Sequence, residues 1–283
     1  MSFFSRSDLA LEFSKKFLDA ETNSYPEGMS VKTYCQGCVE ITCVSIFSKE
    51  LSQKMGKPCG RYITLETPPL WNSLLDPQDE ILAAADCIRT LLPSEGSILV
   101  AGLGNRSITP DALGPAVVER LLATRHLSRE MANQLGLSSL RKTAAIAPGV
   151  MGQTGIESAE IISAVAKMIH PSAVIAIDAL AAEDYSHLGK TIQISDSGIA
   201  PGSGVQNRRA SLSQESLGVP VIAVGVPTVI DAGAFFPEAV SGPMVTPREV
   251  DRMIGHSCKF ISLAINKALY PELSLEEIAF LCE

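Results

Sequence analysis

The sequence predicts an α/β protein with a mostly parallel sheet that is flanked by helices on both faces. From about residue 96 onward, short apolar runs of β-type residues alternate with stretches of helical pattern. Hydrophobic residues make up 46% of the chain but aromatic residues only 5%, so aliphatic side chains must fill the interior. Strands that are buried on both faces have this composition. The length of 283 residues suits one large domain or two modest ones.

The individual elements follow from local patterns. An amphipathic pattern predicts a helix over residues 6–20, and residues 38–66 contain β-type runs. The last helix is expected to begin with Thr246 as N-cap and Pro247 in the first helical position, and to end near Leu269. Between these segments we expect strands at 97–104, 144–150, 173–181, 191–195 and 219–227, and helices at 111–124 and 156–169.

Charge and hydropathy exclude several classes of protein. The 23 Lys and Arg residues against 31 Asp and Glu residues give a net charge of −8, which argues against direct binding to nucleic acid or to an anionic membrane. No apolar run approaches the roughly 18–20 residues that span a bilayer. Residues 1–13 lack the basic flank and apolar core of a secretory signal. We therefore expect a soluble protein of the cytoplasm.

Cysteine usage leaves one alternative open. Seven cysteines in a chain without an export signal argue against a disulfide framework. The pair Cys35 and Cys38, followed by Cys43 and Cys59, could belong to a zinc site. A structural zinc site needs four ligands in closely spaced pairs, and no second C-x-x-C pair is present. We therefore expect reduced cysteines and no metal.

Acidic residues follow several of the predicted strands. Ligands of open α/β sheets bind beyond the carboxyl ends of the strands, so residues at these positions are the candidates for a site. Four acids meet this criterion: Asp111, Asp178, Asp196 and Asp231. We expect their carboxylates to converge on one rim of the sheet. The glycines before Asp111 lack the third glycine of a dinucleotide-binding fingerprint.

Two of these acids have a structural alternative as well as a catalytic one. Asp111 follows Thr109 and Pro110, so it can simply complement the dipole of a helix that starts there. Asp178 interrupts an apolar run, where an unpaired charge would be costly. It is either satisfied by backbone amides or held with a raised pKa that suits general acid–base catalysis. If the two acids share a proton, one can activate water while the other protonates a leaving nitrogen.

The segment at 195–204 is polar and rich in glycine. It is either a mobile surface loop or a substrate-binding loop whose backbone pairs with an extended peptide. Arg208 follows it and could meet acidic side chains of a substrate. The candidate binding residues are Asp196, Gly198, Gly202, Gly204 and Arg208.

These residues lie in stretches that closely resemble the germination protease family of spore-forming bacteria. The resemblance covers most of the chain, in the order that the family has. It rests on GRYITLE (60–66), GLGNRSITPDALGPAVVERLLATRHL (102–127), AIAPGVMGQTGIESAEII (145–162), AVIAIDALAA (173–182), TIQISDSGIAPGSGVQNRR (191–209), LGVPVIAVGVPTVIDA (217–232) and MVTPREVD (244–251).

The resemblance implies an endopeptidase of an atypical aspartic type that needs no cofactor, with its catalytic pair at Asp111 and Asp178. Its substrates would be small acid-soluble spore proteins, degraded in the forespore and spore core when spores germinate. The family is similar in fold to the hydrogenase maturation proteases, which use a metal at the comparable site, whereas this chain shows no obvious histidine ligand there. A metal-dependent endopeptidase and a non-enzymatic binding protein on the same fold remain the alternatives.

Family members are made as zymogens that remove their own N-terminal segment, and they assemble as tetramers. The resemblance places processing at the bond between Asp8 and Leu9. The family's cleavage motif is an acidic residue, a large apolar residue and then Ala, which Asp8-Leu9-Ala10 fits. The expected domains are a propeptide at 1–8 and a single protease domain at 9–283, with a mixed N-terminal portion at 9–95 and a C-terminal helix at 246–269.

Two stretches depart from the family pattern. Only residues 233–243 separate the IDA motif from the MVTPREVD motif, which is shorter than in well-known members. The cysteine-rich segment at 35–59 also matches poorly. The resemblance therefore supports the active site better than it supports the tetramer or the control of the zymogen.

Overall fold

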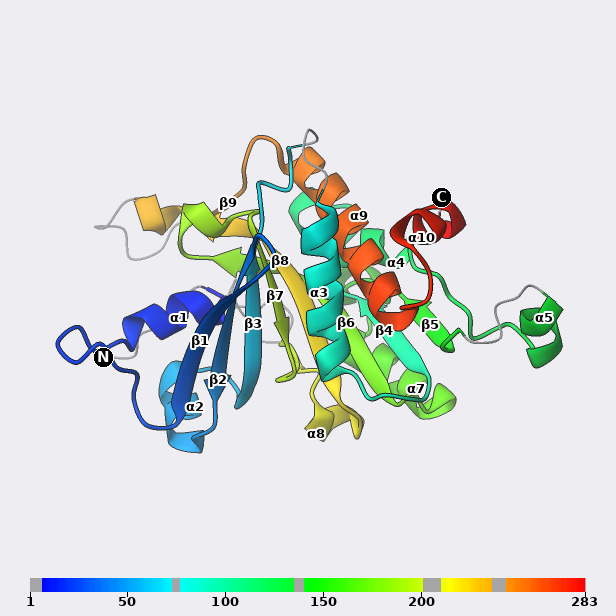
Figure 1. Cartoon of the computed structure of the whole chain (residues 1–283), viewed down its shortest axis with the longest axis horizontal. Helices are drawn as coiled ribbons and strands as arrows, with labels where there is room; N and C mark the ends of the chain where they lie inside the picture. Colours follow the sequence, from blue (N-terminus) through cyan, green and yellow to red (C-terminus); the bar gives the residue numbers. More distant parts are fainter. Residues whose placement is uncertain (1–6, 73–76, 135–139, 201–209, 236–242, 283) are drawn as a thin grey trace.

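The computed structural model describes residues 7–72, 77–134, 140–200, 210–235 and 243–282. Its strands form one sheet (Figure 1): β1 (Met29–Gln36), β2 (Val39–Ile46), β3 (Gly60–Glu66), β4 (Ile98–Gly102), β5 (Thr143–Ile146), β6 (Ala173–Ala182), β7 (Thr191–Ser195), β8 (Val221–Asp231) and β9 (Met244–Val245). The helices are α1 (Ala10–Lys16), α2 (Lys49–Met55), α3 (Gln78–Leu91), α4 (Leu113–Val118), α5 (Arg129–Gln134), α6 (Met151–Thr154), α7 (Ser158–Ile169), α8 (Gln214–Leu217), α9 (Val250–Leu269) and α10 (Leu275–Cys282). Short 3₁₀ turns are η1 (Thr109–Asp111), η2 (Tyr185–His187) and η4 (Ala232–Phe235).

The strands are ordered β1-β2-β3-β7-β8-β6-β4-β5, and β9 pairs with β8. The pairings β4–β5, β4–β6 and β6–β8 are parallel. The remaining pairings of the described strands are antiparallel, namely β1–β2, β2–β3, β3–β7, β7–β8 and β8–β9. The predicted α/β class is confirmed, but the prediction of a mostly parallel sheet is wrong, because antiparallel pairings outnumber parallel ones.

Short connections between consecutive strands explain the antiparallel pairings. Only residues 183–190 connect β6 to β7, and a turn at 37–38 connects β1 to β2. A parallel crossover needs about a dozen residues or more, so neither connection can return the chain in the same direction. Hydrophobic patterning reveals that a strand is buried but says nothing about its direction.

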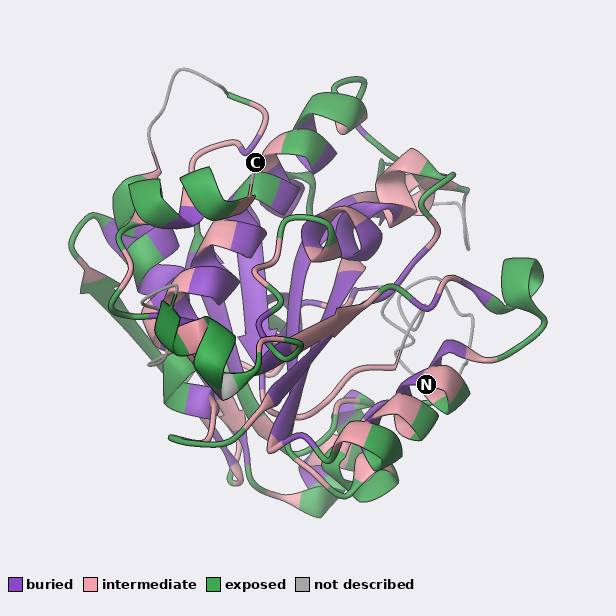
Figure 2. Ribbon diagram, turned by 90° about the vertical axis from the view of Figure 1, so that its right-hand side faces the viewer, coloured by how far each residue is buried: buried purple, intermediate pink, exposed green. Residues whose placement is uncertain are grey.

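Helices cover both faces of the sheet. On one face, α3, α4 and α9 pack against apolar side chains of the central strands, such as Ile177 and Val224. On the other face, α7 contributes Ile162 and Ala166 to a second cluster, and α1 and α2 pack against β2 and β3. Figure 2 shows the buried residues concentrated on the strands and on the inner sides of the helices. The helices on both faces that the sequence predicts are therefore present.

Some elements are shorter than predicted, and others were not predicted. The helix expected over 6–20 is α1, and the one expected over 111–124 is divided into η1 and α4. The strand β1 and the helix α3 have no counterpart among the predicted elements. None of the helices in the described ranges is long and apolar enough to cross a membrane.

The last long helix, α9, begins at Val250 and not at Pro247. A turn precedes it, in which the Val250 N–H donates a hydrogen bond to the Pro247 carbonyl (3.1 Å). The Thr246 hydroxyl donates to the carbonyl of Thr228 on β8 (2.9 Å), so it does not serve as the N-cap. Thr246 thus ties the start of this segment to the sheet.

Candidate active site

Asp178 lies inside β6 and is only 5% exposed. Its neighbour Ile177 belongs to the core under α3 and α9, and side chains alternate along a strand, so the Asp178 side chain lies on the opposite face. One carboxylate oxygen accepts a hydrogen bond from the Ala179 N–H (3.0 Å). Because β6 continues to Ala182, Asp178 does not follow its strand as expected. It stands level with the end of β4, where Gly102 pairs with Ile177.

Asp111 ends the turn η1, beyond β4. Its Oδ2 accepts a hydrogen bond from the Asn105 N–H (2.8 Å). Strand β8 holds the same turn through the Thr228 hydroxyl, which donates to the Pro110 carbonyl (2.7 Å). Gly104 has a φ of +109°, and a Cβ atom there would lie 2.1 Å from the Asp111 carbonyl oxygen, so only glycine fits. The Asp111 carboxylate is thus bound by the loop that precedes it.

The surroundings of Asp111 and Asp178 are connected by hydrogen bonds. The Leu103 N–H donates to the Ile177 carbonyl (2.8 Å), so the loop that binds Asp111 through Asn105 starts beside the residue that precedes Asp178. The two acids therefore lie on adjoining segments at the end of β4. That they share a proton and act as a catalytic pair stays a prediction.

The other two acids of the predicted rim lie elsewhere. Strand β7 runs antiparallel to β8, so Asp196, which follows β7, lies at the amino ends of the parallel strands. There its two carboxylate oxygens accept hydrogen bonds from the backbone N–H (2.7 Å) and the Nε (2.8 Å) of Arg61. The expected convergence is therefore wrong for Asp196, because it assumed one direction for every strand. Asp231 does lie at the carboxyl end of β8, but that strand continues past Gly225, the residue that pairs with Asp178, so Asp231 is not level with Asp178.

The loop after β7 is described only in part. Gly198 lines a pocket of about 310 Å³ that also contacts Asp8, Lys57 and Gln193. A role of this loop in substrate binding stays a prediction. Three of its candidate residues lie outside the described ranges, namely Gly202, Gly204 and Arg208.

The N-terminal segment crosses the face of the sheet that carries Asp178. The Asp8 N–H donates to the Ala181 carbonyl (2.8 Å), and the Ala181 N–H donates to the Asp8 carboxylate (2.9 Å). Leu9 is fully buried and packs against Leu180 of the same strand. The bond between Asp8 and Leu9 therefore lies over β6, a short distance along the strand from Asp178.

Two polar side chains contact the Asp8 carbonyl oxygen. The Lys57 ammonium and the Gln193 Nε2 each donate to it at 3.0 Å. The Oε1 of Gln193 accepts a hydrogen bond from the Ala10 N–H (2.7 Å). The Lys57 ammonium also lies 4.9 Å from the centre of the Phe13 ring. Burial lowers the pKa of Lys57, and the charges of nearby carboxylates oppose this effect.

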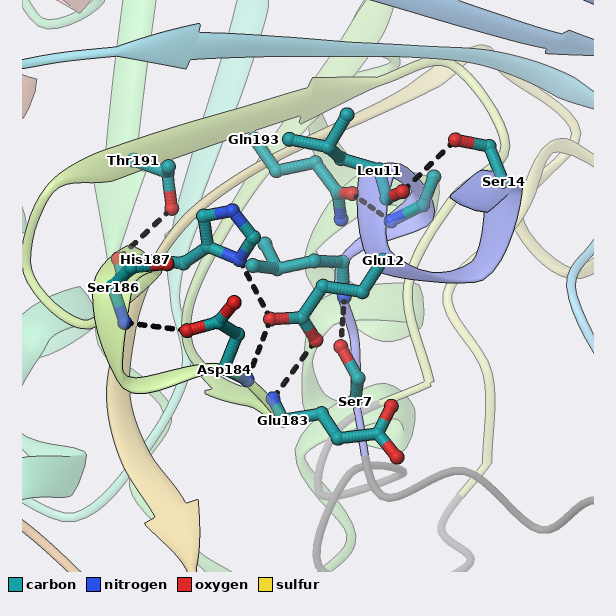
Figure 3. A network of polar contacts seen from close by, with 12 residues as sticks. Ser7, Leu11, Glu12, Ser14, Glu183, Asp184, Ser186, His187, Thr191 and Gln193 are labelled. Atoms are coloured by element: carbon teal, nitrogen blue, oxygen red, sulfur yellow. Dashed lines mark hydrogen bonds and ion pairs between the residues drawn. The ribbon is translucent and has the colours of Figure 1, made fainter. Parts of the chain in front are cut away.

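Further along the segment, backbone amides and the His187 ring contact the carboxylate of Glu12 (Figure 3). Its Oε2 accepts from the Glu183 N–H (2.8 Å), and its Oε1 accepts from the Asp184 N–H (2.9 Å) and lies 2.7 Å from the His187 Nδ1. Burial raises the pKa of Glu12. Hydrogen bonds with His187, Ser7 and the two backbone amides outweigh that effect and hold the pKa below its ordinary value.

The cysteines considered for zinc are spread over β1, β2 and the loops beside them. Cys35, Cys38 and Cys59 are exposed, and Cys43 is half-buried. In the part of the chain that the structure describes, no group of three or more His, Cys, Asp or Glu side chains could hold a metal ion. The geometry therefore gives the zinc alternative no support.

Four residues of this site were not predicted from the sequence: Glu12, Lys57, His187 and Gln193. Gln193 had a readable signal, since it is a polar residue between two isoleucines of a buried strand, much as Asp178 interrupts an apolar run. Lys57 lies in the loop between α2 and β3, where no local pattern marks it.

A family model described as germination protease matches residues 6–241 of the chain. The chain belongs to the germination protease family. The matched range includes both candidate catalytic acids and the Asp8–Leu9 bond. Membership of this family makes the chain a protease of spore germination.

Curated relatives share this description over most of their length. The germination protease of Clostridium tetani is 37% identical over 96% of this chain and 98% of its own length. That of Caldanaerobacter subterraneus subsp. tengcongensis is 39% identical over 96% of each chain. That of Priestia megaterium is 45% identical over 80% of this chain and 64% of its own length. Among solved structures, the NiFe hydrogenase maturation protease HycI of Thermococcus kodakarensis matches 63% of this chain and 98% of its own, with 17% identity and a TM-score of 0.37.

Proposed function

We propose that this chain is an endopeptidase in which Asp111 and Asp178 act as an acid–base pair with water as the nucleophile. We propose further that it is a zymogen that cleaves its own Asp8–Leu9 bond. One observation carries both statements: the Asp8–Leu9 bond lies over β6, on the face that carries Asp178, with the backbone hydrogen-bonded to Ala181. Family membership supplies the reaction class.

The chemistry needs one ionised and one protonated carboxyl group. The ionised carboxylate takes a proton from water as the water oxygen attacks the scissile carbonyl carbon. The protonated carboxyl then gives its proton to the departing nitrogen, and the C–N bond breaks. Two neighbouring carboxyl groups that share a proton provide this state near neutral pH, and their apparent pKa values belong to the pair. Neither Asp111 nor Asp178 is therefore assigned as the base.

In this proposal the propeptide blocks the site by lying in it. Leu9 is fully buried, and Asp8 is hydrogen-bonded to β6 on both its amide and its carboxylate, so a substrate cannot lie on the same strand segment. Cleavage separates residues 1–8 from the mature domain at 9–283. The substrates are small acid-soluble spore proteins, which the enzyme meets in the cytoplasm of the spore core. The mature enzyme is a homotetramer, as the family resemblance implies.

The test follows the intact mass of the purified protein during incubation at mildly acidic and neutral pH. The wild type is expected to lose residues 1–8, whereas Asp111→Asn and Asp178→Asn variants keep them. Asp251→Asn, at an exposed position on α9, is the matched control and should process like the wild type. A folded Asp178→Asn variant that still processes at the wild-type rate would refute the acid–base pair.

A further inference from the structure

The carbonyl oxygen of Asp8 has two hydrogen-bond donors from side chains outside the parallel part of the sheet. Lys57 Nζ and Gln193 Nε2 are each 3.0 Å from this oxygen. Oxyanion holes place two donors about 2.7–3.1 Å from the oxygen on which charge develops. We propose that Lys57 and Gln193 are catalytic residues that form the oxyanion hole of this protease. This inference rests on the proposed function, because it takes the Asp8–Leu9 bond as the bond that is cleaved.

The register of the sheet places Gln193 and Asp178 in one row. Both residues pair with Gly225 of β8, from its two sides. The neighbours Ile177, Ile192 and Ile194 all belong to the core on the opposite face, so the two polar side chains lie on the same face. Strands are about 4.8 Å apart, so the Cα atoms of Asp178 and Gln193 are about 10 Å apart. A peptide carbonyl held by Gln193 therefore lies on the face of the sheet that carries Asp178, two strands from it.

Gly225 leaves room for the Leu180 side chain between the two polar side chains. A Cβ atom at this position would lie 2.6 Å from the Leu180 side chain, which occupies the space. Leu180 in turn packs against Leu9, the residue after the scissile bond. Across the three strands, the row therefore has Asp178 on one side and Gln193, which binds the Asp8 carbonyl, on the other. Between them, Leu180 lies over Gly225 and contacts Leu9.

The backbone of Lys57 is fixed on both sides. Its N–H donates to the Ser52 carbonyl (3.2 Å), and its carbonyl accepts from the Ser52 hydroxyl (2.7 Å). The side chain then runs inward, so that its ammonium lies between the Phe13 ring and the Asp8 carbonyl oxygen. The Lys57 side chain is half-buried. A cation that is partly withdrawn from water stabilises an oxyanion more than a fully solvated cation does, and one that already contacts the carbonyl oxygen needs no reorganisation during the reaction.

Gln193 forms hydrogen bonds with the backbone of the peptide. Its Nε2 binds the Asp8 carbonyl oxygen, and its Oε1 binds the Ala10 N–H. One side-chain amide thus spans the scissile bond and fixes the peptide's register as a neighbouring strand would. These contacts are independent of the side chains of the peptide, so they suit any extended substrate.

Hydrolysis of the Asp8–Leu9 bond proceeds through a tetrahedral intermediate. Water gives a proton to the ionised carboxylate, and its oxygen bonds to the Asp8 carbonyl carbon. The π electrons of the carbonyl move to the oxygen, whose negative charge is bound by the Lys57 ammonium and the Gln193 amide. The carbonyl then re-forms, the bond to the Leu9 nitrogen breaks, and that nitrogen takes the proton of the second carboxyl. The products are a carboxyl group on Asp8 and a free amine on Leu9.

The oxyanion hole is tested by the rate at which the full chain converts to residues 9–283. Intact mass measures this rate in the wild type, Lys57→Met, Lys57→Arg and Gln193→Met. Loss of one oxyanion donor lowers a rate by about 100- to 1000-fold, and we expect this for Lys57→Met and Gln193→Met. Lys57→Arg keeps a cation and should recover part of the rate. Lys54→Met and Gln214→Met, at exposed positions on α2 and α8, are the matched controls.

A second readout separates catalysis from folding and binding. A synthetic peptide with the sequence of residues 3–14 is cleaved in trans by the form of each variant that begins at Leu9, which is produced directly so that it does not depend on self-processing. Thermal unfolding is recorded for each variant. A catalytic role predicts a fall in kcat that exceeds any rise in KM, with the unfolding midpoint unchanged. If Lys57→Met does not fold, the Gln193→Met and Lys57→Arg rates decide.

Suppose that the wild type processes itself, and that folded Lys57→Met and Gln193→Met do so at rates within about threefold of the wild-type rate. Because loss of an oxyanion donor lowers a rate by about 100- to 1000-fold, this result would overturn the oxyanion hole. If the wild type cleaves neither itself nor the peptide between Asp and Leu, the proposed function fails first. If Asp178→Asn processes normally while Lys57→Met does not, the acid–base pair fails and the oxyanion hole stands.

Discussion

Replacing Glu12 by Gln tests how firmly the N-terminal segment is fixed. The Glu12 carboxylate accepts two backbone hydrogen bonds and contacts His187, in a site where both side chains are buried. A Gln side chain has only one oxygen, so its NH₂ group would face a donor that then has no acceptor. A buried donor without a partner costs about 1–3 kcal/mol. In a chain of 283 residues the unfolding entropy is about 0.6 kcal/mol/K, so a loss of this size lowers the melting temperature by about 2–5 °C.

The effect should depend on pH with a definite sign. The folded pKa of Glu12 lies below its ordinary value of 4.5, so the carboxylate stabilises the fold fully above pH 4.5 and loses this contribution as the pH falls through the lowered folded value. The difference in melting temperature between wild type and Glu12→Gln should therefore be constant from pH 6 to pH 8 and narrow below pH 4.5.

Differential scanning fluorimetry across this pH range gives the comparison. Intact mass, recorded on each sample, ensures that the same form of the chain is compared. Glu27→Gln, at an exposed position before β1, is the control and should melt with the wild type. The reasoning is refuted if Glu12→Gln melts with the wild type at pH 7, or if its deficit grows as the solution is acidified.

Four further outcomes are expected. Gly104→Ala should slow self-processing more than tenfold, because its φ of +109° and the 2.1 Å approach to the Asp111 carbonyl oxygen force the loop to move; timed mass spectra measure this. Leu9→Ala removes a fully buried side chain and should weaken docking of the segment by about 2–5 kcal/mol, seen as faster hydrogen exchange of residues 8–12. Asn266→Leu leaves the Leu122 N–H without its side-chain acceptor and should lower the free energy of unfolding by about 1–3 kcal/mol in a denaturant titration, with processing unchanged. Self-processing should continue in a chelator, whereas loss of processing that one divalent ion restores would favour a metal-dependent protease.

Some parts of this structure can be predicted from local sequence patterns, whereas others depend on contacts between residues far apart in the sequence. Asp178 is recognisable because a charge inside an apolar run needs a reason, and Gln193 could have been found in the same way. The helix α3 could also have been found, since Ile81, Ala84, Ala85 and Ile88 follow helical spacing and are buried. The edge strand β1 could not, because it buries only Met29 and its burial pattern shows no alternation.

The direction of each strand and the contacts between distant segments cannot be predicted from local sequence patterns. Asp196 follows an apolar strand as the other candidate acids do, yet the antiparallel course of β7 places it at the opposite edge. Lys57 reaches Asp8 only because α2 and the N-terminal segment pack on the same face of the sheet. Local periodicity contains neither fact. Asp111, Asp178 and Gln193 can therefore be found from the sequence, whereas Lys57 can be found only from the fold.

The order of the strands sets the moment at which self-cleavage can begin. Strands β6 and β7 are consecutive in the chain, but β8 is synthesised after both and lies between them in the sheet. Asp178 and Gln193 acquire a fixed separation only when Gly225 of β8 pairs with each of them. The propeptide leaves the ribosome first, yet it can be removed only after one of the last strands is inserted. In the proposed reaction, loss of the propeptide therefore reports that the sheet is complete, and a nascent or truncated chain that ends before β8 keeps its N-terminus.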